Sequence, residues 1–271
     1  MKAIFFSLLT VFSVSIFALN PSAKYSVTPA DYSLNYEEVT IKTSDNVNLK
    51  AWLYKPAEVS YKMIILSDDG NGNMADLIEI ATNFVSLGYN VLTYDYRGFG
   101  ESDPFDIHPD FYIYTQFALD LNAALDYVRK FHSKCRNVFL YGQGIGASLS
   151  LAIGATRCNE ISKIIADSPY STLESVQKAI KSATGKDVKV PLGFDKAQLE
   201  PKFALQSKGG SLNGILLIYG KLDPVYNASM IKEISGIRSS ITKTYVIKNA
   251  DQTTTFTTSK EDYFKQIKSF L

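Results

Sequence analysis

A glycine-rich turn in the middle of the chain has the setting in which many proteins carry a catalytic nucleophile. Residues 137–141 form a mainly apolar run, the next six residues are Gly142-Gln143-Gly144-Ile145-Gly146-Ala147, and an apolar helical pattern follows. A strand, a sharp turn and a helix in this order present a serine in the pattern Gly-x-Ser-x-Gly for attack on esters or amides. Gly144 stands where that serine would be, so the turn has the expected pattern but no nucleophile.

Several other loops follow predicted strands and are expected at the same edge of the sheet. In a parallel sheet, the segments after the carboxyl ends of the strands meet and build the site. These loops comprise residues 69–73, 94–102, 167–170, 217–224 and 250–252. They contain the charged and polar side chains that could complete a site around Gly144.

The elements that must position these loops alternate along the chain. Short apolar runs predict strands over 63–67, 90–94, 137–141, 163–166, 214–219 and 244–247, and amphipathic stretches such as 77–85 and 117–128 predict helices. Earlier in the chain, 37–43 and 47–54 alternate polar and apolar residues and predict an antiparallel hairpin. This succession predicts an α/β fold with a mostly parallel central sheet and helices on both faces.

One domain is expected over residues 30–271, because no linker, repeat or low-complexity tract interrupts this part of the chain. The stretch 171–213 is too long for a plain crossover between two strands. We expect it to form a short cap insertion with helices over one end of the sheet. A last helix is expected from Ser259, with Asp262 as its capping partner.

The five loops and the glycine turn together resemble the α/β-hydrolase family, in its serine-aminopeptidase-like branch, over most of the chain. Residues 94–102, Tyr-Asp-Tyr-Arg-Gly-Phe-Gly-Glu-Ser, are similar to the turn after the second parallel strand of that branch. Residues 69–73 look like its His-Gly-Asn loop, with Asp69 in place of the histidine. The resemblance implies an α/β-hydrolase fold and assigns the triad positions to Gly144, Asp223 and Gln252, with Asp251 as a one-residue alternative to Gln252.

On these assignments the catalytic triad is degenerate. An acyl-enzyme needs a hydroxyl or thiol for attack and an imidazole to move its proton, and neither glycine nor glutamine supplies them. The main-chain N–H groups of Ile145 and Asn71 would still face the former oxyanion position and could bind a carbonyl or carboxylate. We therefore predict a ligand-binding site rather than an intact catalytic one. Its expected residues are Gly70, Asn71, Gly142, Gln143 and Ile145.

Three side chains could in principle replace the missing groups, but each is assigned a structural role. Ser148 falls one turn down the helix after Gly144, so its hydroxyl should point into helix packing. His108 is expected on a surface loop, and His132 is expected as a cation near the carboxyl end of a helix. We predict no metal and no cofactor.

The first residues have the layout of a secretory signal peptide. Lys2 precedes an uncharged, mostly apolar run through Leu19, and Ala18 is an acceptable cleavage site, so residues 1–18 are expected to be removed. A retained membrane anchor is the alternative, although the run is short for a span of about 20 residues. Cleavage predicts a secreted or periplasmic protein without a stable membrane span.

Charge and cysteine content bear on the partners and on the compartment. The chain has 28 Lys and Arg against 27 Asp and Glu, which gives nucleic-acid binding no electrostatic support. Export would favour oxidation of the two cysteines, and Cys135 and Cys158 flank the strand and helix of the glycine turn at the edge opposite the site. A disulfide between them is expected, with two unpaired thiols as the alternative.

The leading hypothesis is a secreted, catalytically inactive α/β-hydrolase homologue that binds a small ligand or a protein partner. The alternative is a hydrolase of esters or peptides that uses a non-standard catalytic set. A nucleotide-binding α/β protein is disfavoured, because the glycines of 142–146 have the wrong spacing and do not follow the first strand.

Overall fold

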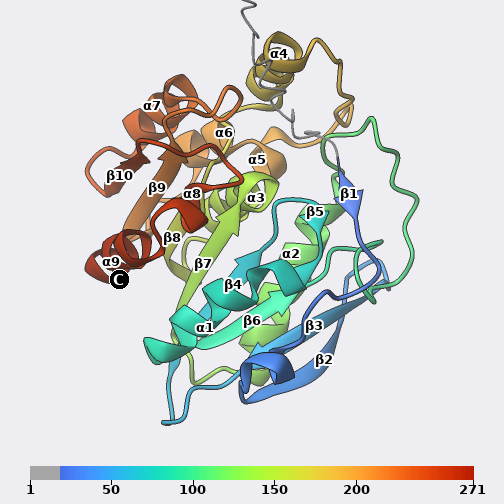
Figure 1. Ribbon diagram of the computed structural model, residues 1–271, viewed down its shortest axis with the longest axis vertical. Helices are drawn as coiled ribbons and strands as arrows, with labels where there is room; N and C mark the ends of the chain where they lie inside the picture. The colour runs from blue at the N-terminus through green and yellow to red at the C-terminus, as the bar shows by residue number, and fades with distance from the viewer. Residues whose placement is uncertain (1–18) are drawn as a thin grey trace, which may run out of the picture.

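A twisted β-sheet forms the centre of the molecule (Figure 1). The computed structural model describes residues 19–271, and within them the sheet has eight strands in the order β10-β9-β8-β7-β4-β6-β3-β2. Strands β2 (Tyr36–Lys42) and β3 (Asn48–Tyr54) form the predicted antiparallel hairpin, and β3 runs antiparallel to β6. All pairs from β6 to β10 are parallel. The predicted fold class is confirmed.

The six parallel strands coincide with the apolar runs of the sequence. They are β4 (Lys62–Ser67), β6 (Asn90–Tyr94), β7 (Asn137–Gln143), β8 (Ile161–Asp167), β9 (Gly214–Gly220) and β10 (Thr242–Ile247). The inner strands are buried on both faces, which is why they read as continuous apolar runs rather than as alternating ones.

Helices cover both faces of the sheet and define two apolar cores. On one face α1 (Ile78–Ser86) and α9 (Lys260–Phe270) pack against strand residues such as Ile64 and Leu66. On the other face α2 (Gln116–Phe131), α3 (Gly144–Thr156) and α7 (Ala228–Ile237) share one apolar core with Met63 and Ile65. Successive residues of β4 thus serve opposite cores, as the pleat of a strand requires. Shorter elements are η1 (Pro29–Tyr32), η2 (Met74–Leu77) and α8 (Thr255–Thr258).

The stretch 171–213 contains three helices, α4 (Leu173–Thr184), α5 (Lys196–Leu199) and α6 (Pro201–Ser207). Helix α4 lies beyond the end of the sheet at which α3 begins, whereas α5 and α6 pack beside α3 (Figure 1). The inserted segment therefore covers the edge of the sheet that carries Gly144.

The domain begins earlier than residue 30, which corrects the predicted boundary. Leu19 is buried, and β1 (Asn20–Pro21) pairs in parallel with β5 (Asn71–Gly72). Farther along, the hydroxyl of Tyr25 donates a 2.5 Å hydrogen bond to Asp95. The predicted signal peptide, residues 1–18, lies outside the described residues. Within residues 19–271, none of the helices is both long and apolar enough to cross a bilayer.

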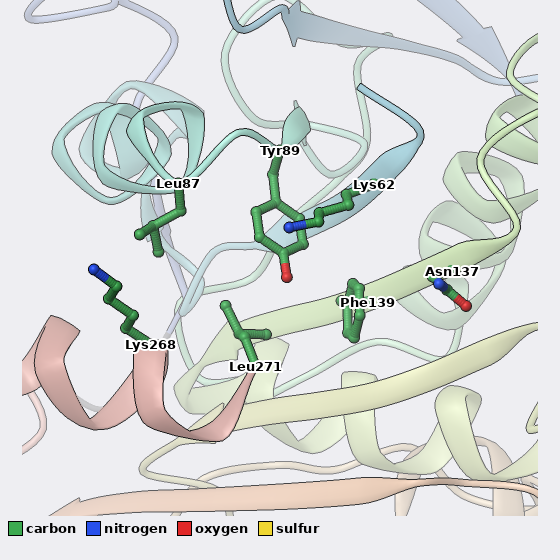
Figure 2. A pocket seen from close by; sticks show the side chains of 7 residues that line it. All are labelled: Lys62, Leu87, Tyr89, Asn137, Phe139, Lys268 and Leu271. Carbon is green, nitrogen blue, oxygen red and sulfur yellow. The ribbon is translucent and has the colours of Figure 1, made fainter. Parts of the chain in front are cut away.

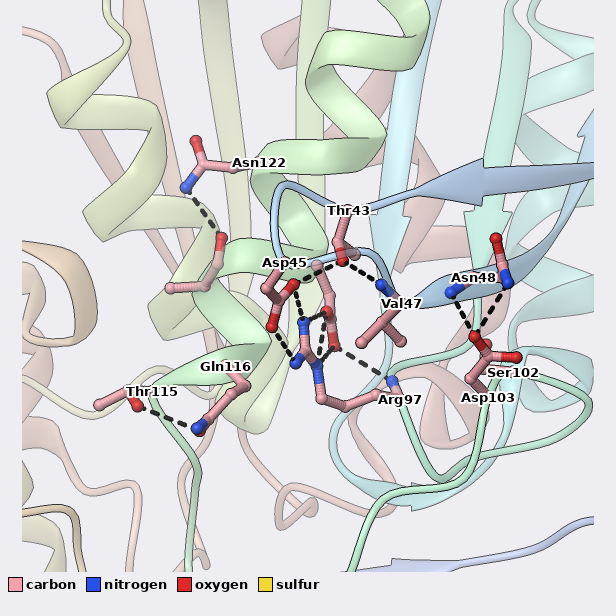
Figure 3. A network of polar contacts seen from close by, with 12 residues as sticks. Thr43, Asp45, Val47, Asn48, Arg97, Ser102, Asp103, Thr115, Gln116 and Asn122 are labelled. Atoms are coloured by element: carbon pink, nitrogen blue, oxygen red, sulfur yellow. Dashed lines mark hydrogen bonds and ion pairs between the residues drawn. The ribbon is translucent and has the colours of Figure 1, made fainter.

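The loop after β6 is held by an ion-pair network around a buried arginine (Figure 3). Arg97 is 2% exposed, and its guanidinium pairs with Asp45 at 2.6 Å and with Asp120 at 2.7 Å. Asp120 comes from α2 and Asp45 from the β2–β3 turn, so Arg97 ties the hairpin and a helix to this loop. Arg97 therefore has a structural role.

The predicted disulfide is wrong, because Cys135 and Cys158 are both free thiols. Both lie at the expected edge of the sheet but on different sides of β7. Cys135 Sγ lies 4.0 Å from the side-chain amide of Asn90, where β6 begins. The thiol of Cys158 is hydrogen-bonded to the main chain at Gly209 and Ser211, ahead of β9. The sheet order β6-β4-β7-β8-β9 separates these two surroundings.

Candidate functional site

The glycine turn has the geometry that its sequence predicts. Strand β7 ends at Gln143, and Gly144 begins α3 with a φ of +52°, in the left-handed region that disfavours side chains. Gly146 is needed for close packing, because a Cβ there would lie 2.4 Å from the carbonyl oxygen of Asp68. Sharp turn, strand and helix are therefore all present around a residue that has no side chain.

The space beside Gly144 is occupied by two other residues. A Cβ built on Gly144 would lie 3.0 Å from Asp69 Cβ and 3.2 Å from Gln252 Nε2. The Gln252 amide in turn donates a 3.0 Å hydrogen bond to Asp69 Oδ2. The structure thus brings Gly144 and Gln252 together as predicted and adds Asp69 as a third member.

Asp223 holds the main chain around it. Its Oδ2 accepts a 2.6 Å hydrogen bond from the N–H of Gln252, and its Oδ1 accepts two of 2.8 Å from the N–H groups of Val225 and Tyr226. Burial raises the pKa of Asp223, against the lowering effect of these three donors. The acid therefore fixes the loop at position 252 through the backbone. The alternative residue Asp251 instead accepts from Thr253 and Thr254 within its own turn.

Two of the predicted ligand-binding residues, Gly70 and Asn71, have main-chain N–H groups that already donate hydrogen bonds within the loop 69–73. The N–H of Gly70 donates to Asp68 Oδ1 at 2.8 Å, and the N–H of Asn71 donates to Asp69 Oδ1 at 2.9 Å. Each aspartate caps an N–H two residues ahead, as Asp side chains commonly do in turns. These two N–H groups are therefore not open to a carbonyl or carboxylate.

The remaining predicted ligand residues differ in what they can offer. Gly142 lies inside β7 between β4 and β8, where its main chain belongs to the sheet. Gln143 ends β7 and is half-buried. Ile145 lies in the first turn of α3, so its N–H has no partner within the helix. Only Ile145 keeps the main-chain donor that was expected to face the former oxyanion position.

The electrostatics of the site are dominated by two neighbouring carboxyl groups. Burial raises the pKa of Asp69 to about 6. Burial, followed by the charge of Asp69, raises the pKa of Asp68 well above its usual range. The further charged group that acts on both carboxyls is another acid, Asp76. This arrangement repels anions and attracts cations and hydrogen-bond donors.

Comparisons with known proteins agree with this architecture. Residues 62–192 match the model of the serine aminopeptidase family S33 (Hydrolase_4). The esterase Pf2001 of Pyrococcus furiosus has a similar structure, with a TM-score of 0.75 and 23% identity over 94% of this chain and 96% of that chain. An acylaminoacyl peptidase of Pyrococcus horikoshii gives a TM-score of 0.65 and 13% identity over 88% of this chain and 40% of that chain. The chain has the α/β-hydrolase fold.

The alignments with curated relatives cover about half of this chain. The protein bem46 of Schizosaccharomyces pombe is 28% identical over 154 residues, which cover 55% of this chain and 49% of the relative. The α/β-hydrolase domain-containing protein WAV2 of Arabidopsis thaliana is 24% identical over 56% of this chain and 48% of its own. The quorum-quenching protein AidA of Acinetobacter baumannii is 30% identical over 52% and 46%, respectively. The chain thus spans about half the length of these relatives.

None of the three other candidate side chains is placed to replace the missing nucleophile or base. Ser148 is fully buried and accepts a 2.9 Å hydrogen bond from the N–H of Tyr170, which confirms its structural role. His108 is a surface side chain 3.4 Å from Asp106. His132 follows the last residue of α2, but burial lowers its pKa, so the expected cation at this helix end is not supported.

A buried hydrogen-bond network beneath the loop at position 252 was not predicted from the sequence. Asp167, at the end of β8, accepts hydrogen bonds from Thr255 Oγ1 at 2.6 Å and from Tyr263 Oη at 2.7 Å. Thr255 lies three residues after Gln252, so Asp167 anchors the segment that delivers the glutamine. The spacing of Asp68 and Asp69 from the N–H groups that they cap was a local signal that sequence reasoning could have used.

Proposed function

We propose that this chain is a secreted or periplasmic, non-catalytic member of the α/β-hydrolase superfamily that binds a small ligand or a protein partner at the former active site. The observation that carries the proposal is the Gln252–Asp69 hydrogen bond beside Gly144. Two side chains fill the space where a nucleophile would stand, and neither is an imidazole.

The chemistry of the site supports binding rather than acyl transfer. A covalent route needs a nucleophile, a base that takes its proton and donors for the developing oxyanion. Glycine supplies no nucleophile, a glutamine amide is not a base, and the Gly70 and Asn71 N–H groups already donate to Asp68 and Asp69. Each of the three requirements is thus weakened by a contact or a substitution at the site itself.

The ligand that fits best donates hydrogen bonds. Gln252 Oε1 is buried and accepts no hydrogen bond among the residues that the structure describes. Beside it, Asp69 presents a half-buried carboxylate near neutral pH. A hydroxyl, amide N–H or ammonium group could satisfy both oxygens, whereas a carboxylate ligand would meet the charge of Asp69. A donor-bearing group therefore replaces the carbonyl or carboxylate expected from the sequence.

A panel of p-nitrophenyl esters and aminoacyl anilides tests the proposal with the purified mature protein. Wild type, Asp223→Asn and Asp69→Asn should all give the rate of buffer alone. Turnover well above buffer that falls in Asp223→Asn would show that the acid still serves catalysis and would refute the proposal. A surface change, Asp31→Asn, is the matched control, because Asp31 lies in η1 and bonds only to Thr28.

The alternative function is hydrolysis by a non-standard catalytic set, and one observation favours it. Asp69 lies beside the position of the missing nucleophile, and a carboxyl group with a pKa of about 6 can act as a general base near neutral pH. In that case a water molecule would replace the serine hydroxyl. Turnover lost in Asp69→Asn but kept in Asp31→Asn would support this function.

The proposed localisation has its own test. If residues 1–18 are removed on export, the mature protein begins at Leu19, whose side chain is buried beside Gly70 and Ile145. Intact-mass measurement of the exported protein should give the mass of residues 19–271. The mass of the full chain in a membrane fraction would instead indicate a retained anchor.

A further inference from the structure

A hollow lies at the edge of the sheet opposite Gly144. It has a volume of about 320 Å³ and lies between the starts of β4 and β7, the loop after α1 and the end of α9 (Figure 2). Asn137 opens β7, and the same strand ends at Gln143, so the two edges are about 20 Å apart at 3.3 Å per strand residue. The residues that line the hollow are Lys62, Leu87, Tyr89, Asn137, Phe139, Lys268 and Leu271.

The polar side chains of this hollow offer hydrogen-bond donors. Lys62 and Lys268 approach it from different walls, and the Tyr89 hydroxyl points into it (Figure 2). Lys62 Nζ lies 5.3 Å from the centre of the Tyr89 ring. Among residues 19–271, neither lysine has an acidic partner within ion-pair distance, and no hydrogen bond engages the Tyr89 hydroxyl.

Nearby acceptors are already engaged by other groups. The main-chain oxygen atoms of Phe270 and Leu271 accept hydrogen bonds from Lys163 Nζ, at 2.5 and 3.1 Å. The side-chain oxygen of Asn137 accepts from the Ser162 hydroxyl, which leaves its amide N–H groups to face the hollow. Two ammonium groups without an acidic partner among the described residues, a phenol and an amide therefore line different walls of this hollow (Figure 2).

Apolar groups form the rest of the wall. Leu87, Phe139 and Leu271 contribute side chains, and the buried ring of Tyr89 lies beside Lys62 (Figure 2). Ligand sites of small molecules combine apolar wall surface with a few polar groups, and their volumes begin near 300 Å³. A ligand with an anionic head and a short apolar body matches both parts.

We propose that this hollow binds a small carboxylic acid with an apolar tail, its carboxylate between Lys62 and Lys268 and its tail against Leu87, Phe139 and Leu271. The Tyr89 hydroxyl donates a third hydrogen bond to the carboxylate. Charge-assisted hydrogen bonds of this kind are stronger than neutral ones, so the two lysines should dominate the affinity. The site is independent of the proposed function at Gly144.

Octanoate is the probe, and methyl signals of leucine report where it binds. In the full mature protein labelled at leucine methyl groups, octanoate should shift the signals of Leu87 and Leu271 saturably. Leu222 is exposed near the opposite edge and should not shift. Octylammonium and inorganic phosphate are titrated in parallel, because the first lacks the negative charge and the second lacks the tail.

Variants assign the binding to the two lysines. Lys62→Met and Lys268→Met should each weaken octanoate about tenfold, the loss of roughly one charge-assisted hydrogen bond. Lys248→Met makes the same charge change on an exposed lysine just after β10 and should leave the affinity unchanged. Unchanged chemical shifts away from the hollow would show that each variant folds.

Three results would overturn the proposal. Octanoate that does not shift Leu87 and Leu271 saturably would show that the hollow is not a site for it. Equal binding of octylammonium or phosphate would show that it does not recognise an apolar carboxylate. An affinity unaffected by both lysine variants would remove the assigned contacts.

Discussion

Replacing Asp167 by asparagine should flatten the dependence of stability on pH. Asp167 is 1% exposed and accepts three side-chain hydrogen bonds, from Ser168, Thr255 and Tyr263. Burial outweighs these donors and raises its pKa from 3.8 to about 6. The folded state therefore binds this proton more tightly than the unfolded state does.

The sign and size of the effect follow from that difference. The stability contributed by a raised pKa is fully present below pH 3.8 and is lost as the pH rises through about 6. Two pKa units correspond to about 3 kcal/mol of unfolding free energy. An asparagine side chain cannot ionise, so the difference in stability between wild type and Asp167→Asn should change by about 2 kcal/mol between pH 4 and pH 7.5, most of the full effect.

Urea unfolding of both proteins at half-unit steps of pH measures this difference directly. Asp95 and Asp120 also have pKa values raised to about 6, so both curves should fall with rising pH, and the wild-type curve should fall more. Asparagine preserves the shape of the side chain and can still bond to Thr255 and Tyr263. Parallel curves for the two proteins would refute the account of Asp167 as a buried, protonatable anchor of the loop at position 252.

Three further predictions concern the site, the core and the thiols. Gly144→Ser alone should remain inactive, whereas Gly144→Ser combined with Gln252→His should give weak esterase activity, because Asp223 is still in place. Adding Asp69→Gly should raise this activity, because it removes the contact of 3.0 Å between Asp69 Cβ and a Cβ at position 144. Equal activity of the single and double variants would mean that Gln252 does not mark the base position. Arg97→Ala should lower the unfolding free energy by about 3–5 kcal/mol, because Asp120 would be left buried and unpaired. The control Lys55→Ala breaks an exposed pair with Glu37 and should cost at most about 1 kcal/mol. If urea unfolding gave similar losses for the two variants, the structural role of the Arg97 network would be contradicted. Alkylation of the unfolded, non-reduced protein should modify both Cys135 and Cys158, and a mass without adducts would restore the disulfide.

The sequence predicts the fold well where periodicity and turn chemistry agree. Residues 90–94 were predicted as a strand and form β6 with those bounds, and the glycine turn at 142–146 joins a strand to a helix as expected, with Gly144 in the left-handed region. These features are local, because an apolar run and a residue with positive φ depend on their own neighbours in the chain.

The site could be predicted only in part, because its decisive contacts join distant segments. Position 252 was assigned by resemblance, but its bond to Asp69 connects residues 183 positions apart. Strand β1 has only two residues and no periodicity, so its pairing with β5 leaves no pattern in the sequence. The predicted disulfide was wrong for a similar reason. The sequence indicated that both cysteines lie at the same edge of the sheet, but the side of β7 on which each one lies depends on the strand order.

The most direct test of the proposal that the protein is not catalytic is the pH–rate profile for p-nitrophenyl butyrate from pH 5 to 8, measured side by side for wild type and Asp69→Asn. This comparison covers both the missing serine route and a water route through Asp69, whose pKa is about 6. The account predicts that the two profiles coincide with each other and with buffer at every pH. A wild-type rate that rises through pH 6 and disappears in Asp69→Asn would contradict it and show that the protein is an enzyme.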